Sequence, residues 1–248
     1  MRSFTLVLLL CLGYGHLTTS YKHFMQVWSK LIVTHHWPQT FCSMEHCNTH
    51  FDYWTLHGLW PDKGGTCNTS WHFNASQIED LMPEMKKWWP DLLHPDPSNS
   101  TVFWKHEWQK HGTCAVQSEA LDSEHKYFSK ALELYHKLDL DGVLRKSNIV
   151  PSEKFYNFDD IEEAIHGFYN VKPKIQCIPP KPGENVQTLG QIEICFNKDF
   201  QLIDCQKSEL DNRNQHNDNL TYGFYGSTGY MVCQENKEVY YPPLMGKY

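Results

Sequence analysis

The cysteine content is the feature that most constrains how this chain can fold. The first twenty residues carry Arg2, an apolar run at residues 4–12, and small or polar residues up to Ser20, which is the layout of a cleaved secretory signal. Removing this segment leaves an even number of cysteines, and such a number in a secreted chain indicates disulfides. They are Cys42, Cys47, Cys67, Cys114, Cys177, Cys195, Cys205 and Cys233. We therefore expect a mature chain, residues 21–248, that is braced by four disulfides.

Each of these interpretations has an alternative. The apolar run is too short to span a bilayer, so a retained anchor is disfavoured against a cleaved signal at residues 1–20. Zinc binding is the alternative for the cysteines, and the lack of a paired C-x-x-C motif counts against it. Spacing leaves the pairing of the cysteines open, although Cys195 and Cys205 flank a turn at residues 197–199 and are well placed to bridge a hairpin.

Four sequons for N-linked glycosylation agree with passage through the secretory lumen. Each N-x-S/T tripeptide also marks an expected surface loop. The acceptor residues are Asn68, Asn74, Asn99 and Asn219. Together with the signal and the paired cysteines, they predict a glycoprotein that enters the secretory pathway, is soluble in a lumen and is not inserted in a membrane.

The composition predicts one folded domain and limits the partners that it can hold. The 248 residues are 40% hydrophobic and 21% charged, and neither a fixed repeat nor a linker divides them. A net charge of −7 is the wrong sign for gripping long nucleic acid through a basic stripe. Protonation of the 15 histidines would move this charge from −7 to about +8, so an acidic compartment can reverse its sign.

Two strands are expected in the first part of the mature chain. Residues 24–33 form an apolar run that ends at residues 35–38, which predicts a buried strand closed by Pro38. Residues 51–57 have a period-2 pattern with Phe51, Thr55 and His57 on one face. This pattern places His57 at the end of the second strand, just before Gly58.

The middle third predicts helices and the last third predicts short strands. Residues 76–89 have helical spacing that Pro83 interrupts, and residues 123–140 give the clearest amphipathic pattern, ending at Gly142. A further helix follows Phe158 and turns Ile161 and Phe168 inward. Strands are expected at 175–177, 187–196, 200–205 and 238–241, and an exposed loop at 211–220. Because no regular βαβ alternation occurs, we expect a single-domain α+β fold with an antiparallel β-sheet core flanked by helices.

A dense group of titratable residues stands near the middle of the chain. The sequence HEWQKH at residues 106–111 places two imidazoles, a carboxylate and an ammonium in six positions, and His57 adds a third imidazole. Cleaving a phosphodiester requires a base for the nucleophilic hydroxyl, an acid for the departing oxygen, and positive charge for the phosphorane between them. On an α-helix Glu107–His111 and His106–Lys110 form adjacent i, i+4 pairs. We therefore expect one polar wall with acid–base chemistry.

Two alternatives exist for this hexad. A zinc-binding helix needs H-E-x-x-H, whereas His106 and His111 are five residues apart and about 140° apart on a helical wheel. A solvated amphipathic segment is the second alternative. The aromatic residues Phe103, Trp104 and Trp108 interleave with the polar ones and favour a backbone that is anchored in a core.

The residues around these histidines resemble a known family. The sequences TLHGLWP at 55–61 and FWKHEWQKHGTC at 103–114 are similar to the two active-site segments of the ribonuclease T2 family. The likeness covers nearly all of the mature chain, because Trp37-Pro38, the eight cysteines and the sequence GQIE at 190–193 also resemble the vertebrate secreted and lysosomal members. Both active-site segments are intact.

The resemblance implies an endoribonuclease that cleaves single-stranded RNA at acid pH without a cofactor or metal. The 2′-hydroxyl would be the nucleophile, and a 2′,3′-cyclic phosphate would precede a 3′-phosphate end, so DNA should be inert. By motif position, His111 resembles the base, His57 the acid and His106 a phosphate contact, while Glu107 and Lys110 resemble the groups that stabilise the pentacovalent state. Spacing alone leaves the parts of His57 and His111 interchangeable.

The resemblance also implies base-binding residues, and other functions remain possible. Trp60, Asp62 and Phe103 resemble positions beside the scissile nucleotide, although Trp60 and Phe103 are equally consistent with core packing and Asp62 with capping a turn. A secreted signalling protein on the same fold is one alternative function, and a metallohydrolase is another. We expect a monomer whose partner is its RNA substrate.

Overall fold

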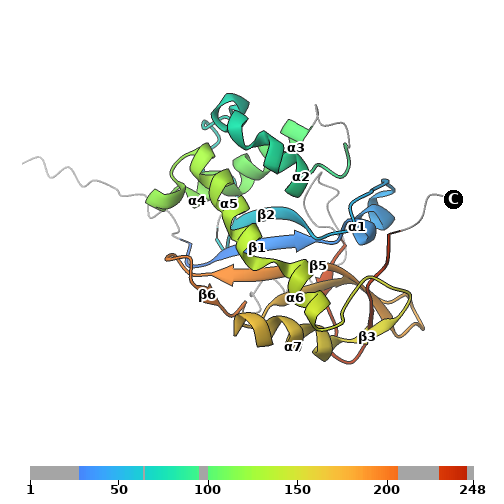
Figure 1. Ribbon diagram of the computed structural model, residues 1–248. Coiled ribbons are helices and arrows are strands. Elements are labelled where there is room, and N and C mark those ends of the chain that lie inside the picture. Colours follow the sequence, from blue (N-terminus) through green and yellow to red (C-terminus); the bar gives the residue numbers. More distant parts are fainter. Residues whose placement is uncertain (1–27, 64, 95–99, 206–228, 245–248) are drawn as a thin grey trace, which may run out of the picture.

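Among the described residues, an eight-stranded sheet forms the centre of this computed structural model (Figure 1). The structure describes residues 28–63, 65–94, 100–205 and 229–244. Several sequence-based predictions therefore lie outside the described residues. These are the signal at 1–20, the first part of the expected strand at 24–27, the sequons at Asn99 and Asn219, and the loop at 211–220.

Strand β1 (Leu31–His36) holds the sheet together near its centre. It pairs with β2 (Thr55–Pro61) on one side and with β5 (Val186–Phe196) on the other, and β4 (Lys174–Ile178) continues beyond β5. These pairs are antiparallel, as expected, but β8 runs parallel to β5, so the sheet is mixed. The short strands are β3 (Phe155–Asn157), β6 (Leu202–Ile203), β7 (Met231–Val232) and β8 (Glu238–Tyr240).

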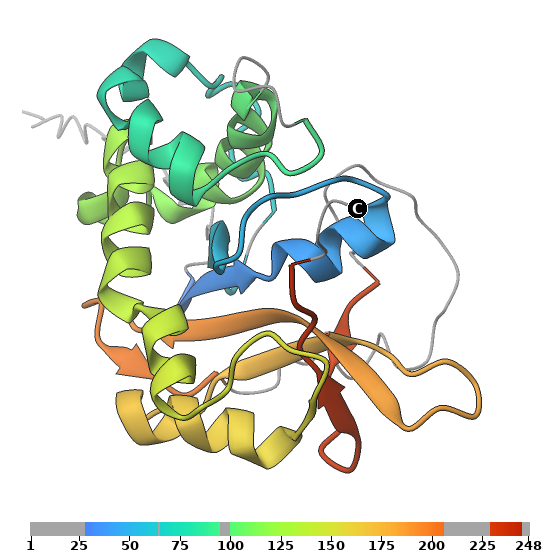
Figure 2. The same cartoon turned by 45° about the vertical axis from the view of Figure 1, so that its right-hand side comes forward.

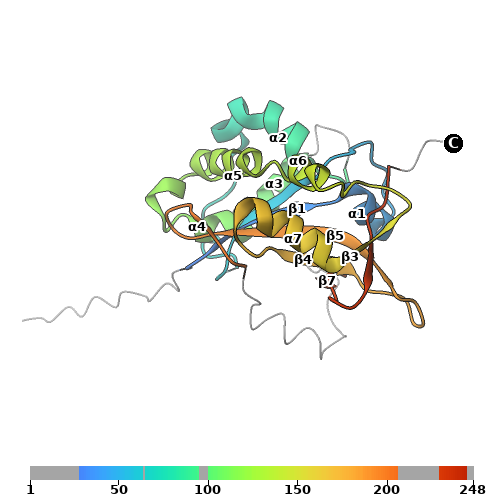
Figure 3. The same cartoon turned by 60° about the horizontal axis from the view of Figure 1, so that its bottom comes forward.

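Helices from the middle of the chain pack against this sheet, which confirms the α+β class. Figure 2 shows α5 leading through α6 to α7 along one side of the sheet, and Figure 3 shows α4 and α1 toward opposite ends of β1. The helical segments are α1 (Pro38–Glu45), η1 (Ala75–Leu81), α2 (Met82–Trp88), α3 (Ser100–Glu107), η2 (Trp108–Gly112), α4 (Thr113–Ala115), η3 (Glu119–Leu121), α5 (Glu124–Leu138), α6 (Leu140–Lys146) and α7 (Phe158–Tyr169).

The clearest sequence pattern forms α5, but its end was predicted wrongly. Ser123 caps the helix by accepting a hydrogen bond from the backbone N–H of Lys126, and the apolar face is buried. The helix ends at Leu138 rather than at Gly142, because Asp139 adopts a left-handed conformation with φ 39°. The carboxylate of Asp139 then accepts from the backbone N–H of Gly142, which starts α6. Gly142 therefore lies inside a second helix.

Other element predictions need smaller corrections. The first described strand runs from Leu31 through His36, so both histidines before Trp37 belong to the strand. The second begins at Thr55 and continues past Gly58 to Pro61, so His57 lies within a strand and does not end it. Phe168 on α7 is 56% exposed instead of pointing inward, because the buried face of that helix is made by Phe158, Ile161 and Ile165.

Buried tryptophans link the helical part of the fold to the sheet. The indole N–H of Trp89 donates to the carbonyl of His57 at 2.6 Å, and that of Trp104 donates to the carbonyl of Trp89 at 2.9 Å. Both indoles are fully buried, and a buried indole N–H needs such an acceptor. The backbone at His57 is therefore fixed by a chain of bonds that reaches α3.

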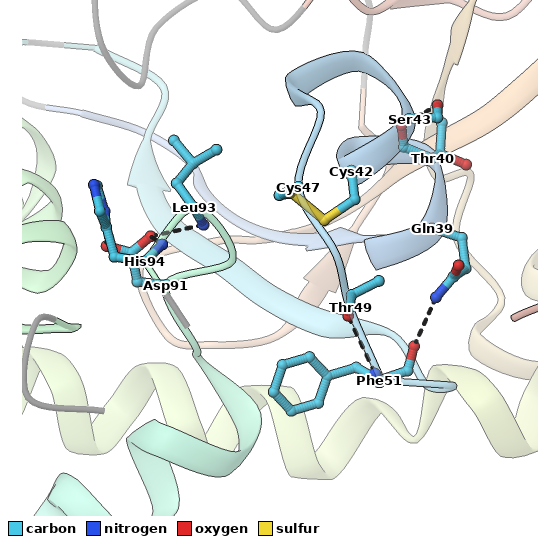
Figure 4. The surroundings of a disulfide bond; sticks show 10 residues. All are labelled: Gln39, Thr40, Cys42, Ser43, Cys47, Thr49, Phe51, Asp91, Leu93 and His94. Carbon is cyan, nitrogen blue, oxygen red and sulfur yellow. Dashed lines mark hydrogen bonds and ion pairs between the residues drawn. A yellow bond between two sulfur atoms is a disulfide. The ribbon is translucent and has the colours of Figure 1, made fainter. Parts of the chain in front are cut away.

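The eight cysteines from Cys42 to Cys233 form four disulfides, as expected. The pairs are Cys42–Cys47, Cys67–Cys114, Cys177–Cys233 and Cys195–Cys205. The Cys195–Cys205 bridge spans the predicted hairpin between β5 and β6. Figure 4 shows Cys42–Cys47 at the end of α1, where Gln39 also donates to the carbonyl of Phe51. Such cross-links stabilise the fold chiefly by restricting the unfolded chain.

Two of the predicted sequons lie in the described part of the chain. Asn68 and Asn74 are exposed, and the side-chain oxygen of each accepts hydrogen bonds from the serine two residues later, Ser70 and Ser76. Asn74 also caps η1. Both side chains lie at the surface, where a glycosyl transferase can reach them, and their occupancy stays a prediction.

His35 gives a prediction for stability against pH. Its ring is fully buried and stacks on Tyr135, and burial lowers its pKa from 6.5 to about 4. Below pH 6.5 the unfolded chain binds a proton at this position that the folded chain excludes. Acidification therefore lowers the free energy of unfolding, by up to about 3 kcal/mol at pH 4. His35→Phe should remove this loss, so urea unfolding at about pH 7.5 and pH 4.5 should give a smaller difference than the wild type. This assignment would be contradicted if the unfolding free energy changed equally between the two pH values in His35→Phe and in the wild type. It would also be contradicted if His72→Phe, at an exposed site, reduced that change as much as His35→Phe does.

Candidate active site

His57 lies at an irregularity in the pairing of β1 with β2. In the β1–β2 register Thr34 pairs with Gly58 and His35 pairs with Leu56, so His57 has no partner in the ladder. A bulge of this kind bends the strand and redirects a side chain. The ring of His57 is 6% exposed and stacks on His36 at a centroid distance of 4.8 Å.

A glutamine fixes the orientation of the His57 ring. The Nδ1 atom of His57 lies 2.6 Å from Oε1 of Gln191 on β5, and Nε2 of Gln191 donates to Oε1 of Gln176 on β4 at 2.8 Å. Neither glutamine was predicted as a site residue. The sequence offered a weak signal, because Gln191 belongs to the GQIE segment, but the contact depends on three paired strands.

The hexad is not one regular α-helix. Helix α3 ends at Glu107, and residues Trp108–Gly112 form a π-helical turn, η2, so the prediction of a uniform 100° spacing was wrong. A π turn has i→i+5 backbone bonds and is wider than an α turn. His106 and His57 both act electrostatically to lower the pKa of His111, which is consistent with the three imidazoles lying near one another.

Trp60 connects the two active-site segments. Its indole N–H donates to Oε2 of Glu107 at 2.8 Å, and its ring stacks on His111 with centroids 5.1 Å apart and planes at 25°. The same indole is T-shaped to the His57 ring, with the ring centroids 4.8 Å apart and the planes at 77°. Trp60 is half-buried. Through these contacts, this one side chain positions the carboxyl group of Glu107 and the rings of His57 and His111.

The downstream loop of β2 is also fastened to the hexad. The disulfide Cys67–Cys114 joins the loop to α4, and the backbone N–H of Thr66 donates to the carbonyl of Lys110 at 2.9 Å. These bonds hold η2 and α4 against the loop that follows β2. A disulfide and a backbone hydrogen bond outside the site therefore fix the backbone that carries its side chains.

Gly58 is required where the two segments meet. A Cβ atom at this position would collide with the indole nitrogen of Trp60 and with Oε2 of Glu107. We expect Gly58→Ala to separate Trp60 from Glu107, lower RNA cleavage, and cost roughly 1–3 kcal/mol of unfolding free energy by overpacking. Urea unfolding and initial cleavage rates measure both effects. Gly65→Ala is the control because nothing lies within 4 Å of a Cβ there, and equal losses in the two variants would rule out the steric explanation.

Burial sets the protonation of the site in the absence of substrate. Desolvation lowers the pKa of His57 to about 4, and it lowers the pKa of His111 well below 6.5, with Lys110 and His106 acting in the same direction. Desolvation raises the pKa of Glu107 to about 8, although the Trp60 bond and Lys110 oppose this. At mildly acid pH the Glu107 carboxyl is therefore neutral, and the positive charge of Lys110 is not cancelled by it.

The remaining predicted residues fall into two groups. Phe103 is 3% exposed and its ring centroid lies 6.1 Å from that of His57, so it lines the site from α3. Asp62 is engaged elsewhere: its carboxylate accepts from the backbone and hydroxyl of Ser29 and from the backbone of Lys30, at 2.7–3.1 Å. These bonds tie the loop after β2 to the residues before β1, so they are long-range contacts and not the local turn cap that was the alternative for Asp62.

The arrangement defines a class of site. Two imidazoles with lowered pKa values flank an indole, a buried carboxyl and an ammonium, which is a histidine-based acid–base site able to act on a phosphodiester. Within the described part of the chain, no group of three or more His, Cys, Asp or Glu side chains is placed to hold a metal ion. In the same part, no helix is both long and apolar enough to cross a bilayer.

Comparisons with known proteins agree with this class. The model of the ribonuclease T2 family matches residues 28–205. The chain is 60% identical to ribonuclease T2 of Danio rerio over 227 residues, which are 92% of each protein. The fold is similar to the crystal structure of human RNase T2, with a TM-score of 0.72 and 47% identity over 87% of this chain and 99% of that one. A variant of RNase MC1 of bitter gourd, in complex with 5′-UMP, matches with a TM-score of 0.64 and 26% identity over 72% of this chain and 93% of that one.

The chain belongs to the ribonuclease T2 family. The resemblance seen in the sequences TLHGLWP and FWKHEWQKHGTC is therefore confirmed, as is the α+β fold with four disulfides.

Proposed function

We propose that this chain is an endoribonuclease that cleaves single-stranded RNA at acid pH without a metal ion. The single observation that carries the proposal is that His57 and His111 lie against the same indole, Trp60, with ring centroids 4.8 and 5.1 Å from it. Lys110 acts electrostatically on both imidazoles. Membership of the ribonuclease T2 family and the bound 5′-UMP of RNase MC1, a relative in fold, support the same substrate class.

The residues suggest a two-step mechanism. In the first step His111 takes the proton of the 2′-hydroxyl while its oxygen bonds to phosphorus, the bond to the 5′ oxygen breaks, and His57 protonates that oxygen. Lys110 and His106 stabilise the phosphorane, and the neutral Glu107 carboxyl can donate a hydrogen bond to it. The product is a 2′,3′-cyclic phosphate. In the second step water attacks phosphorus, His57 accepts its proton, and His111 returns a proton to the 2′ oxygen, which leaves a 3′-phosphate.

The pKa of His57 predicts a difference between two pH profiles. As the acid, His57 must be protonated, so kcat/KM should fall as the pH rises through its free-enzyme pKa of about 4. The negative charge of a bound phosphodiester stabilises the imidazolium and raises that pKa. The alkaline limb of kcat should therefore lie at least about one pH unit above the limb of kcat/KM. Steady-state kinetics between about pH 3.5 and 7.5 measure both limbs, and coincident limbs would argue against His57 as the acid.

End-group analysis tests the reaction class. A mixed-sequence RNA oligomer is digested at about pH 5 with a chelator present, and an all-DNA oligomer of the same sequence is the control. We expect 2′,3′-cyclic phosphate ends early, 3′-phosphate ends late, and intact DNA, because the nucleophile is the 2′-hydroxyl. Products with a 5′-phosphate end, cleavage of the DNA, or no RNA cleavage when the chelator is present would overturn the proposal.

We also propose where the protein acts and in what form. The signal at residues 1–20 would direct a monomer to the secretory pathway, and glycans at Asn68 and Asn74 would cover exposed loops next to Cys67. Secretion or lysosomal delivery agrees with disulfides and with an acid–base site that works at low pH. Mass analysis of protein collected from culture medium, before and after glycosidase treatment, tests cleavage of the signal and occupancy together.

A further inference from the structure

A pair of buried amides lies behind the ring of His57. Gln191 is 3% exposed, and its Oε1 lies 2.6 Å from Nδ1 of His57. Its Nε2 donates to Oε1 of Gln176 at 2.8 Å. Gln176 and Gln191 are direct partners in the β4–β5 ladder, and Gln191 is the direct partner of His36 in the β1–β5 ladder. The amides are therefore held by the sheet and reach His57 across β1.

We propose that Gln191, oriented by Gln176, is a positioning residue that holds the neutral His57 with its proton on Nδ1 and leaves Nε2 to face the substrate. This inference deepens the proposed function and rests on it, since it assigns the atom of His57 through which the proton moves.

The orientation follows from counting donors and acceptors. The amide nitrogen of Gln191 is used in the bond to Gln176, so its oxygen is the atom turned to His57. A carbonyl oxygen only accepts, and the hydrogen in this short contact must therefore come from Nδ1. A neutral imidazole has one N–H, so Nε2 of His57 is left as an acceptor that can be protonated and then donate.

No other neighbour in the described part of the chain favours a proton on His57 in the same way. His36 from β1 and His106, Lys110 and His111 from α3 and η2 are coupled electrostatically to His57, and all are neutral or positive. The Glu107 carboxyl, which is bonded to Trp60 beside His57, is neutral at acid pH because burial raises its pKa to about 8. Lys110 and His106 lower the pKa of His57, whereas the Gln191 bond raises it. Gln191 thus has two effects on the His57 ring. It favours the tautomer with the proton on Nδ1, and it raises the pKa of the ring.

Two substitutions at Gln191 should act in opposite directions. Gln191→Met removes the acceptor, so neutral His57 should shift to the Nε2–H form and the alkaline limb of kcat should move to lower pH. Gln191→Glu keeps an acceptor and adds negative charge, so the Nδ1–H form should persist and the limb should move to higher pH. The kcat of Gln191→Met should fall roughly 10–100-fold, the size seen when a partner that orients a histidine is lost, with KM within about twofold.

Matched variants distinguish loss of the Gln191–His57 hydrogen bond from destabilisation of strand β5. Gln187 is on the same strand, is 2% exposed, and donates to backbone carbonyls at Gln234 and Lys237, away from His57. Gln187→Met should leave the pH profile and the tautomer unchanged. Gln176→Met should reproduce the effect of Gln191→Met in smaller degree and should add nothing to it in the double variant, because Gln176 acts through Gln191.

The deciding measurement is a long-range ¹H–¹⁵N spectrum of the histidine rings at about pH 7.5, with His57 assigned by its loss in His57→Ala. Neutral His57 should show a proton on Nδ1 in the wild type and on Nε2 in Gln191→Met. An Nε2–H signal in the wild type, an unchanged tautomer in Gln191→Met, or equal shifts of the pH limb in Gln191→Met and Gln191→Glu would overturn the inference. The spectrum needs no substrate, so a protein that does not cleave RNA would refute the proposed function and leave this result readable.

Discussion

Replacing either His57 or His111 with alanine is expected to lower kcat for RNA cleavage by about 10²–10⁴-fold, which is the usual contribution of a positioned acid or base. Each proton transfer is assigned to one imidazole in the proposed mechanism. Glu107 is neutral at acid pH, because burial raises its pKa to about 8, and it is bonded to Trp60. It therefore makes a poor substitute as a base.

The double variant sharpens this prediction. If His57 and His111 act in one step, the second substitution should lower kcat by a much smaller factor than the first, whichever residue is replaced first. The reason is that a residual rate from binding and charge stabilisation remains. His125→Ala is the control, because its exposed ring pairs with Asp80 at 2.9 Å on the helical side of the molecule. A loss of less than about tenfold in either single variant would contradict the assigned parts. A cell-based effect that survives the double substitution would favour the signalling alternative.

The sequence predicted the site more completely than it predicted the geometry of the site. The residue types at 106–111 and at His57 follow from the chemistry of phosphodiester cleavage, and the amphipathic pattern of α5 follows from its burial. These features are local in the sequence. They can be read without knowing which strands pair, although the regular helical spacing predicted for the polar wall was wrong.

The features that were missed depend on contacts between distant segments. The π turn at Trp108–Gly112 and the bulge at His57 have no local signature, because each is a shift in backbone pairing that the surrounding structure imposes. Gln191 reaches His57 only because β1 lies between β2 and β5. A glutamine in a strand reads as an ordinary polar residue until the register of three strands is known.

The contacts of Asp62 and Trp60 also depend on distant segments. Motif position placed both beside the base, but Asp62 binds Ser29 and Lys30, and Trp60 bonds to Glu107 while stacking on His111. One face of the indole is therefore already occupied. Any base that stacks on Trp60 must use the other face, so binding of a nucleotide and positioning of His111 are linked through one ring.

Removing the charge of Lys110 is expected to have the second largest effect. Lys110→Met should lower kcat by about 10²–10³-fold at about pH 5, because the phosphorane carries more negative charge than the substrate and a fixed cation in a buried site stabilises it selectively. The charge of Lys110 already acts on His57, Glu107 and His111 without substrate. Since Glu107 is neutral at this pH, that charge is available to the phosphate.

The matched control lies five residues away on α3. Lys105 is exposed, has the same side chain and belongs to the last turn of the helix that carries His106, but the site is not on its side. Lys105→Met should change kcat by no more than a few-fold and should alter mainly the salt dependence of KM, because an exposed cation acts through screened attraction. If Lys110→Met raised KM and left kcat unchanged, Lys110 would bind the ground state and the transition state equally. The proposed stabilisation of the phosphorane would then have to come from His106 and Glu107 alone.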